Sequence, residues 1–117
     1  MQQASFVIDI RCPSNTIAVL DIQGDLTSAS EDALTNAYGE IDGTVVEAIV
    51  LNFQELEYMN SSGIGLLVTM LIRVQRQKQS LLAYGLTDHY QQIFDLTRLN
   101  EAIGIYDSES AALSAAA

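Results

Sequence analysis

Runs of apolar residues along the chain predict the strands of a β-sheet. In residues 5–11 the side chains of Phe6, Ile8 and Ile10 alternate with those of Val7 and Asp9, and residues 16–22 form a second apolar run after a Pro-Ser-Asn turn. Such a pair is typical of a β-hairpin. Residues 45–53 and 80–85 are nearly continuous apolar runs, which indicates strands buried on both faces of a sheet. A last, short strand is predicted over residues 103–106.

Apolar residues at helical spacing predict helices in the remaining segments. The first helix is expected to open with a capping box of Ser28 and Glu31 and to end near residues 39–43. The last two helices are expected over residues 88–98 and 108–116. Together with the helix described next, these segments make four predicted helices.

The second predicted helix begins at Ser62 and has the clearest apolar stripe. Basic residues gather at its far end, where the helix dipole favours them. Its predicted core-facing residues are Ile64, Leu67, Val68, Leu71 and Val74. Leu66 and Met70 are left on the other side, so they are expected either to be exposed and to bind a partner or to pack under a neighbouring helix.

The predicted elements follow one another in the order β-β-α-β-α-β-α-β-α. This order predicts an α/β fold, with a mixed β-sheet of about five strands and four helices mainly on one face. A chain of 117 residues, about half of them apolar, is long enough to bury one core. Residues 1–117 are therefore expected to form a single domain.

Charge and composition restrict the possible functions. Fifteen acidic and five basic residues give a net charge of −10, which disfavours binding to nucleic acid or to an anionic membrane and favours a basic partner. The single cysteine, Cys12, excludes an internal disulfide and is expected to be a small buried or turn residue. No stretch has the pattern of a signal peptide or a membrane span, so a cytoplasmic protein is expected.

The residues that carry most enzymatic chemistry lack evident partners in this sequence. The one histidine, His89, falls at a predicted helix start and is interpreted as a surface residue. Ser61 and Ser62 are not in a G-x-S-x-G motif, because Met59 occupies the place of its first glycine. The two glycines that follow are not joined by the third glycine or the lysine of a phosphate-binding loop. Neither enzyme activity nor a cofactor is expected.

Acidic residues near the predicted hairpin leave two alternatives. Asp9, Asp21 and Asp25 lie on adjoining strands, where they are interpreted as solvated charges rather than as ligands of a metal ion. A receiver domain of this size would need a phosphoacceptor aspartate at the end of the central strand, where this chain has Asn52 between two apolar residues. No metal site and no receiver function are therefore predicted.

Residues 57–68 (EYMNSSGIGLLV) join a predicted strand to a predicted helix and place two serines beside two glycines. A serine on a turn before a helix is held outward, and small residues at Gly63 and Gly65 allow the backbone of a partner to approach. The N–H groups at the helix start would tolerate a phosphate there. The alternative is that Ser61 or Ser62 merely caps the helix.

Four segments of the sequence resemble the STAS family, and within it the stand-alone anti-sigma factor antagonists. They are residues 24–27 (GDLT), which are expected to end the second strand, residues 50–53 (VLNF), residues 59–65 (MNSSGIG) and residues 93–99 (IFDLTRL). The segment at the helix start is the most specific of them. The resemblance covers essentially the full length and implies a STAS-like fold for the whole chain.

The resemblance implies a phosphorylation switch at Ser61. In this family the loop usually reads Asp-Ser-Ser-Gly or Asp-Ser-Thr-Gly, and the anti-sigma factor, a serine kinase with a GHKL-type ATP site, phosphorylates the serine after the aspartate. A metal-dependent serine phosphatase usually removes the phosphate. Here Asn60 replaces the aspartate, which preserves the shape but removes the charge and is expected to slow phosphorylation.

The resemblance also implies a partner-binding face around this serine. An acidic turn near the phosphorylated loop is part of the family pattern, so Asp25 is expected to border the face, although it could equally be an ordinary solvated charge. The predicted face comprises Asp25, Asn60, Ser61, Ser62, Gly63, Gly65, Leu66 and Met70.

Two functional hypotheses follow from the sequence. In the first, the unphosphorylated protein binds an anti-sigma kinase and frees a sigma factor, and phosphorylation of Ser61 breaks that complex. In the second, the chain is a constitutive STAS subunit that docks on a transporter or a signalling complex without a phosphate cycle. The intact Ser61-Ser62-Gly63 segment favours the first hypothesis, and Asn60 favours the second.

Overall fold

A five-stranded mixed sheet lies at the centre of the computed structural model, which describes residues 6–117. The strands are β1 (Phe6–Arg11), β2 (Ile17–Leu26), β3 (Ala48–Met59), β4 (Ser80–Tyr84) and β5 (Gly104–Tyr106). The helices are α1 (Glu31–Gly39), α2 (Ser61–Arg76), α3 (Asp88–Leu96) and α4 (Glu109–Ala116), with short 3-10 helices η1 (Ser28–Ser30) and η2 (Leu99–Glu101). The strands lie in the order β1-β2-β3-β4-β5, with β1 antiparallel to β2 and the other neighbours parallel. The predicted element order and fold class are confirmed.

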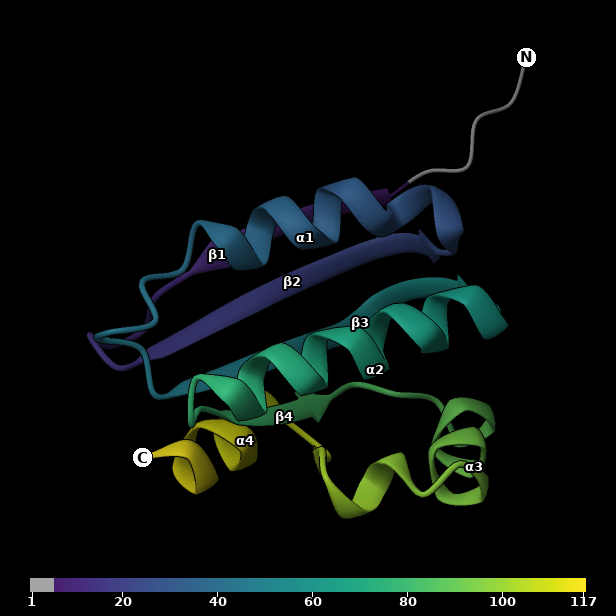
Figure 1. The fold of residues 1–117 in the computed structure, drawn as a ribbon. Helices are drawn as coiled ribbons and strands as arrows, with labels where there is room; N and C mark the ends of the chain where they lie inside the picture. Colours follow the sequence, from purple (N-terminus) through teal and green to yellow (C-terminus); the bar gives the residue numbers. More distant parts are fainter. Residues whose placement is uncertain (1–5) are drawn as a thin grey trace.

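Helices cover the two faces of the sheet unequally (Figure 1). On one face α1, α2 and α3 enclose the main core, to which β2 contributes Leu20 and Ile22 and α3 contributes Phe94. On the other face α4 covers a smaller apolar cluster that contains Val19 and Val50. The central strands are thus buried on both faces, which explains their continuous apolar sequence. The prediction of helices mainly on one face is confirmed, with α4 as the exception.

β2 and β3 run further than their sequence patterns predict. Residues 24–27 do not break the second strand, because β2 continues to Leu26 through an irregularity in register at Gly24, whose φ is 93°. β3 continues to Met59, and its last residues pair with the end of β2. β4 stops earlier, at Tyr84. The two long strands therefore carry the chain to the start of α2.

The start of the first helix also differs from the prediction. Thr27 and Ser30 form the capping box, in place of the predicted pair Ser28 and Glu31. Thr27 directly follows the last residue of β2, so the capped turn begins there as η1, and α1 begins only after it, at Glu31. The helix ends at Gly39, within the range 39–43 predicted for its end.

The isolated residues singled out in the sequence lie on the surface. Cys12 is exposed in the turn after β1, and His89 is exposed in the first turn of α3, as predicted. Ser5, the expected first residue of the first strand, lies outside the described residues. Within residues 6–117, every helix is too short or too polar to span a membrane.

A polar network connects the hairpin to α4 on the less covered face of the sheet. Arg11 binds the carboxylate of Asp21 at 2.5 and 2.8 Å and that of Glu109 at 3.0 and 3.1 Å. The Tyr84 hydroxyl donates to Glu109, and the Asn52 amide donates to Asp21, each at 2.7 Å. Asp21 is therefore an ion-pair partner, and the described residues contain no cluster of three side chains suited to a metal ion.

Acid is expected to weaken this network. The Arg11 guanidinium holds the pKa of Asp21 and the pKa of Glu109 below their usual values, and burial together with the bond to Glu109 raises the pKa of Tyr84 to about 12. Because both carboxyl pKa values are depressed on folding, their stabilisation is present above the unfolded values of about 4 and is lost as the pH falls through the folded ones.

The variant Glu109→Gln keeps the size of the side chain but not its charge. It should therefore be less stable than the parent mainly above about pH 4, where the carboxylate of the parent is charged. We expect it to be less stable than the parent by roughly 1 kcal/mol at about pH 7, since these side chains are partly exposed to solvent, and by less at about pH 3, below the unfolded carboxyl pKa. Urea unfolding followed by circular dichroism at both pH values measures the difference. An equal difference at both would mean that the Glu109 charge is not stabilising.

Candidate functional site

The ends of β2 and β3 converge with the start of α2 at one end of the sheet (Figure 1). In the register of the two strands Asp25 lies opposite Tyr58, and Leu26 lies opposite Met59. The chain then turns at Asn60, whose N–H is 3.4 Å from the carbonyl oxygen of Leu26. The structure thus places Asp25 beside the start of the helix.

Asn60 is the N-cap of α2. Its backbone is extended, and its side-chain oxygen Oδ1 accepts a hydrogen bond from the Gly63 N–H at 3.0 Å. The alternative that Ser61 or Ser62 caps the helix is therefore wrong. Both serines belong to the first turn of α2, both are exposed, and within residues 6–117 neither hydroxyl has a hydrogen-bond partner. Two hydroxyl groups are thus available to another protein.

The two glycines of this segment have different roles. Gly63 is buried, and a Cβ at this position would lie 2.9 Å from the carbonyl carbon of Leu26 and closer still to its oxygen. The expectation that Gly63 admits the backbone of a partner is therefore wrong, because Gly63 admits the backbone of β2 instead. Gly65 is exposed, and a Cβ on it would meet no heavy atom of another segment within 4 Å, so it remains open to a partner.

The buried side of α2 is centred differently from the prediction. Met70 is only 3% exposed and belongs to the main core with Leu67 and Val74, whereas Val68, predicted to face the core, is 38% exposed. Leu66 is half-buried against the same core. Of the two alternatives for Met70, exposure is therefore wrong, and packing under a neighbouring helix is confirmed. Packing of α1 beside α2 decides this side, since apolar residues occur nearly all around the helix.

An exposed stripe runs along α2 from Ser61. Gly65, Val68 and Ile72 follow Ser61 at i+4, i+7 and i+11, and this spacing places all four on one side of a helix. Val68 and Ile72 are 38% and 44% exposed. We call these four residues the α2 stripe. Its spacing is visible in the sequence, but only the structure distinguishes it from the buried side.

α3 supports the same end of the sheet through a contact that the sequence pattern did not predict. The Tyr90 hydroxyl accepts a hydrogen bond from the Met59 N–H at 2.9 Å, one residue before the cap of α2. The exposed large apolar residues outside the predicted face include Tyr58 at 49% and Leu96 at 83%. Leu96 lies off the side of α3 that carries the buried residues Tyr90 and Phe94, which is the signal that could have identified it.

The arrangement presents a serine hydroxyl that could accept a group from another protein. Asn60 holds the first turn of α2, and the free hydroxyl of Ser61 is presented at the end of the α2 stripe. A phosphate on this hydroxyl would lie near the N–H groups of the first turn, which carry a partial positive charge. The fold can therefore accommodate an anion here while the charge of the surface changes.

The chain matches a family model described as "STAS domain" over residues 8–112. An anti-sigma-B factor antagonist of Listeria monocytogenes is 33% identical over 67 residues, and the same holds for one of Listeria innocua. Each match includes 56% of this chain and spans 59% of the length of the curated relative.

Solved structures share the fold at lower sequence identity. An anti-sigma factor antagonist from Mycobacterium paratuberculosis has a TM-score of 0.83 at 17% identity, with 98% of this chain and 97% of that chain covered. The unphosphorylated form of the anti-sigma factor antagonist SpoIIAA has a TM-score of 0.73 at 17% identity, covering 93% and 96%. A sulfate transporter family protein from Wolinella succinogenes reaches 0.75 at 18% identity, covering 86% and 84%. Identities this low establish the fold alone.

Proposed function

Since the chain belongs to the STAS domain family, we propose that it is an anti-sigma factor antagonist that acts by partner switching. The observation that carries this proposal is the first turn of α2, where Asn60 provides the cap and the Ser61 hydroxyl is exposed, with no hydrogen-bond partner among residues 6–117. The similarity to the anti-sigma-B factor antagonists of Listeria supports the same function. No catalytic activity of its own is proposed.

In the proposed cycle the unphosphorylated protein binds an anti-sigma factor that is also a serine kinase of the GHKL type. The interface would contain the α2 stripe, with Asp25 on one side and the half-buried Leu66 at its edge. Binding of this chain displaces a sigma factor from the kinase. Gly63 and Met70, which are buried, support the face from beneath and do not touch the partner.

Phosphorylation of Ser61 would then end the complex. The Ser61 oxygen bonds to the γ-phosphorus of ATP as the bond to ADP breaks, and the hydroxyl proton passes to a base of the kinase. The phosphate adds about −1.5 to −2 charges to the interface. A metal-dependent serine phosphatase would hydrolyse the phosphoserine and restore binding. This cycle places the protein in the cytoplasm.

Asn60 bears on the rate of this reaction more than on the shape of the site. The Asn60 side chain caps α2 through one oxygen, and an aspartate could accept the same hydrogen bond. The position of Ser61 should thus be the same with either residue, whereas the negative charge beside the hydroxyl is lost with Asn. A second candidate function, a constitutive docking subunit without a phosphate cycle, is favoured by this one observation.

The variant Val68→Glu tests the proposed face. Val68 is exposed in the middle of the α2 stripe, so a glutamate there should leave the fold intact but place an unpaired charge in the interface with the kinase. We expect the affinity for the anti-sigma factor to fall at least about tenfold, a loss of 1.4 kcal/mol or more, with little change in the thermal midpoint. Isothermal titration calorimetry and thermal melting measure the two quantities.

Val45→Glu is the matched control for this variant. Val45 is 46% exposed and lies in the loop before β3, which packs near Gln77 at the opposite end of α2 from Ser61. It adds the same charge to the protein but should leave the affinity unchanged. Equal losses of affinity for both variants would show that the added negative charge, and not its position on the α2 stripe, weakens binding. Unchanged affinity of Val68→Glu would show that the α2 stripe is not part of the interface.

A further inference from the structure

The last residues of β3 extend beyond the end of β4. β4 pairs with β3 only as far as Tyr84, which lies opposite Asn52, whereas β3 continues to Met59. The Asn60 N–H points to Leu26 of β2, so the N–H of Met59, one residue earlier, points to the side where β4 has ended. Within residues 6–117, no strand lies on that side to accept its hydrogen bond.

The hydroxyl of Tyr90 takes the place of the missing strand. Its oxygen lies 2.9 Å from the Met59 nitrogen and accepts the hydrogen bond of that N–H. Both residues are buried, with Met59 4% and Tyr90 9% exposed. A buried N–H without a partner is unfavourable, so this hydrogen bond fixes the end of β3 relative to α3.

The position of the Tyr90 hydroxyl is itself fixed by α3. The Tyr90 ring belongs to the main core together with Phe94, one turn later in the helix. The ring of His89 packs against it edge to face, with the two centroids 4.9 Å apart. The side chain of Gln91 donates to the carbonyl oxygen of Leu86 at 3.0 Å and so holds the first turn of α3. The hydroxyl is therefore an acceptor in a defined place.

Met59 transmits this restraint to the start of α2, because its backbone directly precedes the cap residue Asn60. A second backbone hydrogen bond at this point joins the Asn60 N–H to the carbonyl oxygen of Leu26, but it is long, at 3.4 Å. The bond to Tyr90 is within the usual range for N–H···O bonds and is therefore the stronger of the two. It holds the chain two residues before Ser61.

We propose that Tyr90 is a positioning residue for the phosphorylation of Ser61, an inference that rests on the proposed function. Its hydroxyl holds the end of β3, and thereby the Asn60 cap and the Ser61 hydroxyl, in the orientation that the active site of a kinase requires. A displacement of about 1 Å in a reacting group can cost about 100-fold in rate. Binding of the kinase depends less on Tyr90, because Val68 and Ile72 lie about two and three turns further along α2.

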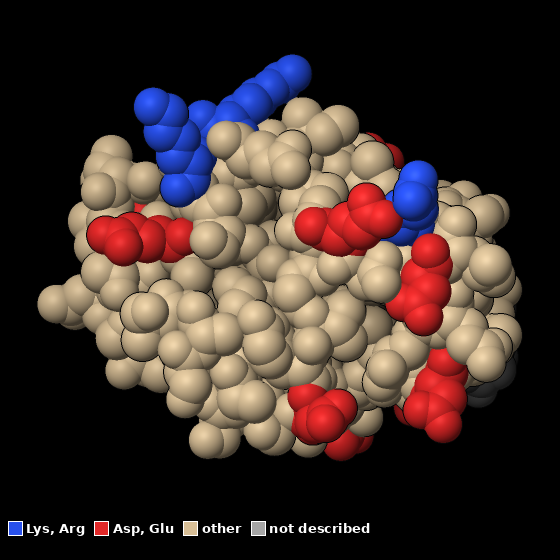
Figure 2. All heavy atoms as spheres, turned by 90° about the horizontal axis from the view of Figure 1, so that it is seen from below, with Lys and Arg blue, Asp and Glu red and all other residues tan. Residues whose placement is uncertain are grey.

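Tyr90 acts from inside the fold and not as a contact for the kinase. The buried side of α3 carries Tyr90 and Phe94, and its exposed residues include Gln92 and Leu96. Figure 2 views the side of the molecule that carries α3 and α4, where acidic and basic side chains form separate groups rather than one charged patch. The charges on this side thus do not single out α3 as a docking surface. Because the core encloses its ring, Tyr90 affects a bound kinase through Met59.

Tyr90→Phe tests the proposal, because it keeps the buried ring and removes only the acceptor oxygen. With the cognate kinase and ATP, we expect kcat for phosphorylation of Ser61 to fall at least about tenfold. The Kd for the kinase, measured by calorimetry without ATP, should change by less than about twofold, since the α2 stripe is unaltered. The Gly63 amide, which donates to the Asn60 cap, should exchange with solvent at least about fivefold faster in ¹⁵N–¹H spectra.

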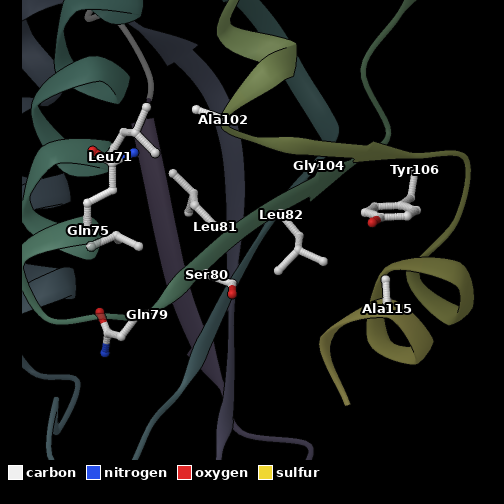
Figure 3. A pocket seen from close by; sticks show the side chains of 11 residues that line it. Leu71, Gln75, Gln79, Ser80, Leu81, Leu82, Ala102, Gly104, Tyr106 and Ala115 are labelled. Atoms are coloured by element: carbon white, nitrogen blue, oxygen red, sulfur yellow. The ribbon is translucent and has the colours of Figure 1, made fainter.

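Tyr38→Phe is the matched control, since it also removes the hydroxyl of a buried tyrosine. The Tyr38 hydroxyl donates to the side-chain oxygen of Gln79 at 2.7 Å. Gln79 borders a cavity of about 360 Å³ beside β4, at the opposite end of α2 from Ser61 (Figure 3). Both variants should lower the thermal midpoint by similar amounts, but Tyr38→Phe should leave kcat and Gly63 exchange unchanged. Measurements well below both midpoints keep loss of folded protein from contributing.

The possible results separate this inference from the proposed function. Unchanged kcat or unchanged Gly63 exchange in Tyr90→Phe, or equal changes in Tyr38→Phe, would overturn the positioning role and leave phosphorylation of Ser61 intact. A parent protein that is not phosphorylated on Ser61 would contradict the proposed function and, with it, a role of Tyr90 in that reaction. Faster Gly63 exchange in Tyr90→Phe alone would then show that Tyr90 positions only the start of α2.

Discussion

Phosphorylation of Ser61 is expected to lower the affinity for the anti-sigma factor by at least about 100-fold, a loss of roughly 3 kcal/mol. The Ser61 hydroxyl is exposed at the end of the α2 stripe, where a bound partner would enclose it. A phosphate there must lose its hydration in a close-packed interface without a matching positive charge, whereas in the free protein it stays in water beside the helix N–H groups. The phosphate therefore destabilises the complex and not the fold of the free protein.

Incubation with the cognate kinase and ATP, followed by mass spectrometry and calorimetry, measures this effect. One phosphate should appear on Ser61, and Ser61→Ala should remain bound to the kinase at any ATP level. Ser61→Asp should weaken binding only in part, because a carboxylate carries less charge than a phosphate and fewer acceptor oxygens. The thermal midpoint of the free protein should change little in both variants, because Asn60 still caps α2.

Two further variants at neighbouring residues decide between the proposed functions. Ser62→Ala, which removes the adjacent exposed hydroxyl, should still be phosphorylated on Ser61. Asn60→Asp should be phosphorylated faster than the parent, since it restores the charge while keeping the cap. Phosphate found only on Ser62, or no phosphate with any kinase of the same organism, would contradict a switch at Ser61. Either result would favour the second candidate function, a constitutive docking subunit.

Gly63→Ala is expected to destabilise the fold by about 2–3 kcal/mol, through overpacking of a buried position. A methyl group on Gly63 would overlap the backbone carbonyl of Leu26. Moving the end of β2 away from the first turn of α2 would relieve the overlap but would break the hydrogen bond from the Asn60 N–H to the Leu26 carbonyl oxygen. The gain in helix propensity from alanine, about 1 kcal/mol, only partly offsets this strain. Urea unfolding of the purified variant measures the loss.

Gly65→Ala provides a matched comparison within the same helical turn. Gly65 is exposed and has open space around it, so alanine should stabilise α2 by up to about 1 kcal/mol. The two substitutions should thus have effects of opposite sign. If Gly63→Ala were as stable as the parent, the close packing of α2 on the end of β2 would be refuted.

The strands illustrate how far a pattern of apolar residues predicts structure. The apolar parts of β2 and β3 were evident from the sequence, whereas residues 54–59 include Gln54, Glu55 and Glu57 and do not resemble a strand. They become one because β2 pairs with them, and the backbone hydrogen bonds between two strands do not depend on the side chains. Such pairing between distant segments leaves no signal in either segment alone.

The second helix shows the same limit for side chains. Its existence followed from helical periodicity, but its first residues are apolar or small on all sides, so the pattern does not define which side is buried. Packing of α1 and of the end of β2 selects Gly63, Leu67 and Met70 as the inner residues. That selection places Val68 outside and corrects the predicted partner face.

The sequence by itself determined the order of elements, the α/β class and the candidate segment, because hydrophobic periodicity and the residues Asn60-Ser61-Ser62-Gly63 are local features. The tertiary structure decided that Gly63 contacts β2 and that Asn60 caps α2 in place of a serine, so that the Ser61 hydroxyl has no partner within residues 6–117. It also decided the extent of the sheet, because β5 pairs with β4 from Leu82 to Tyr84. These features depend on contacts between segments far apart in the chain, where backbone geometry and not residue type determines which groups meet.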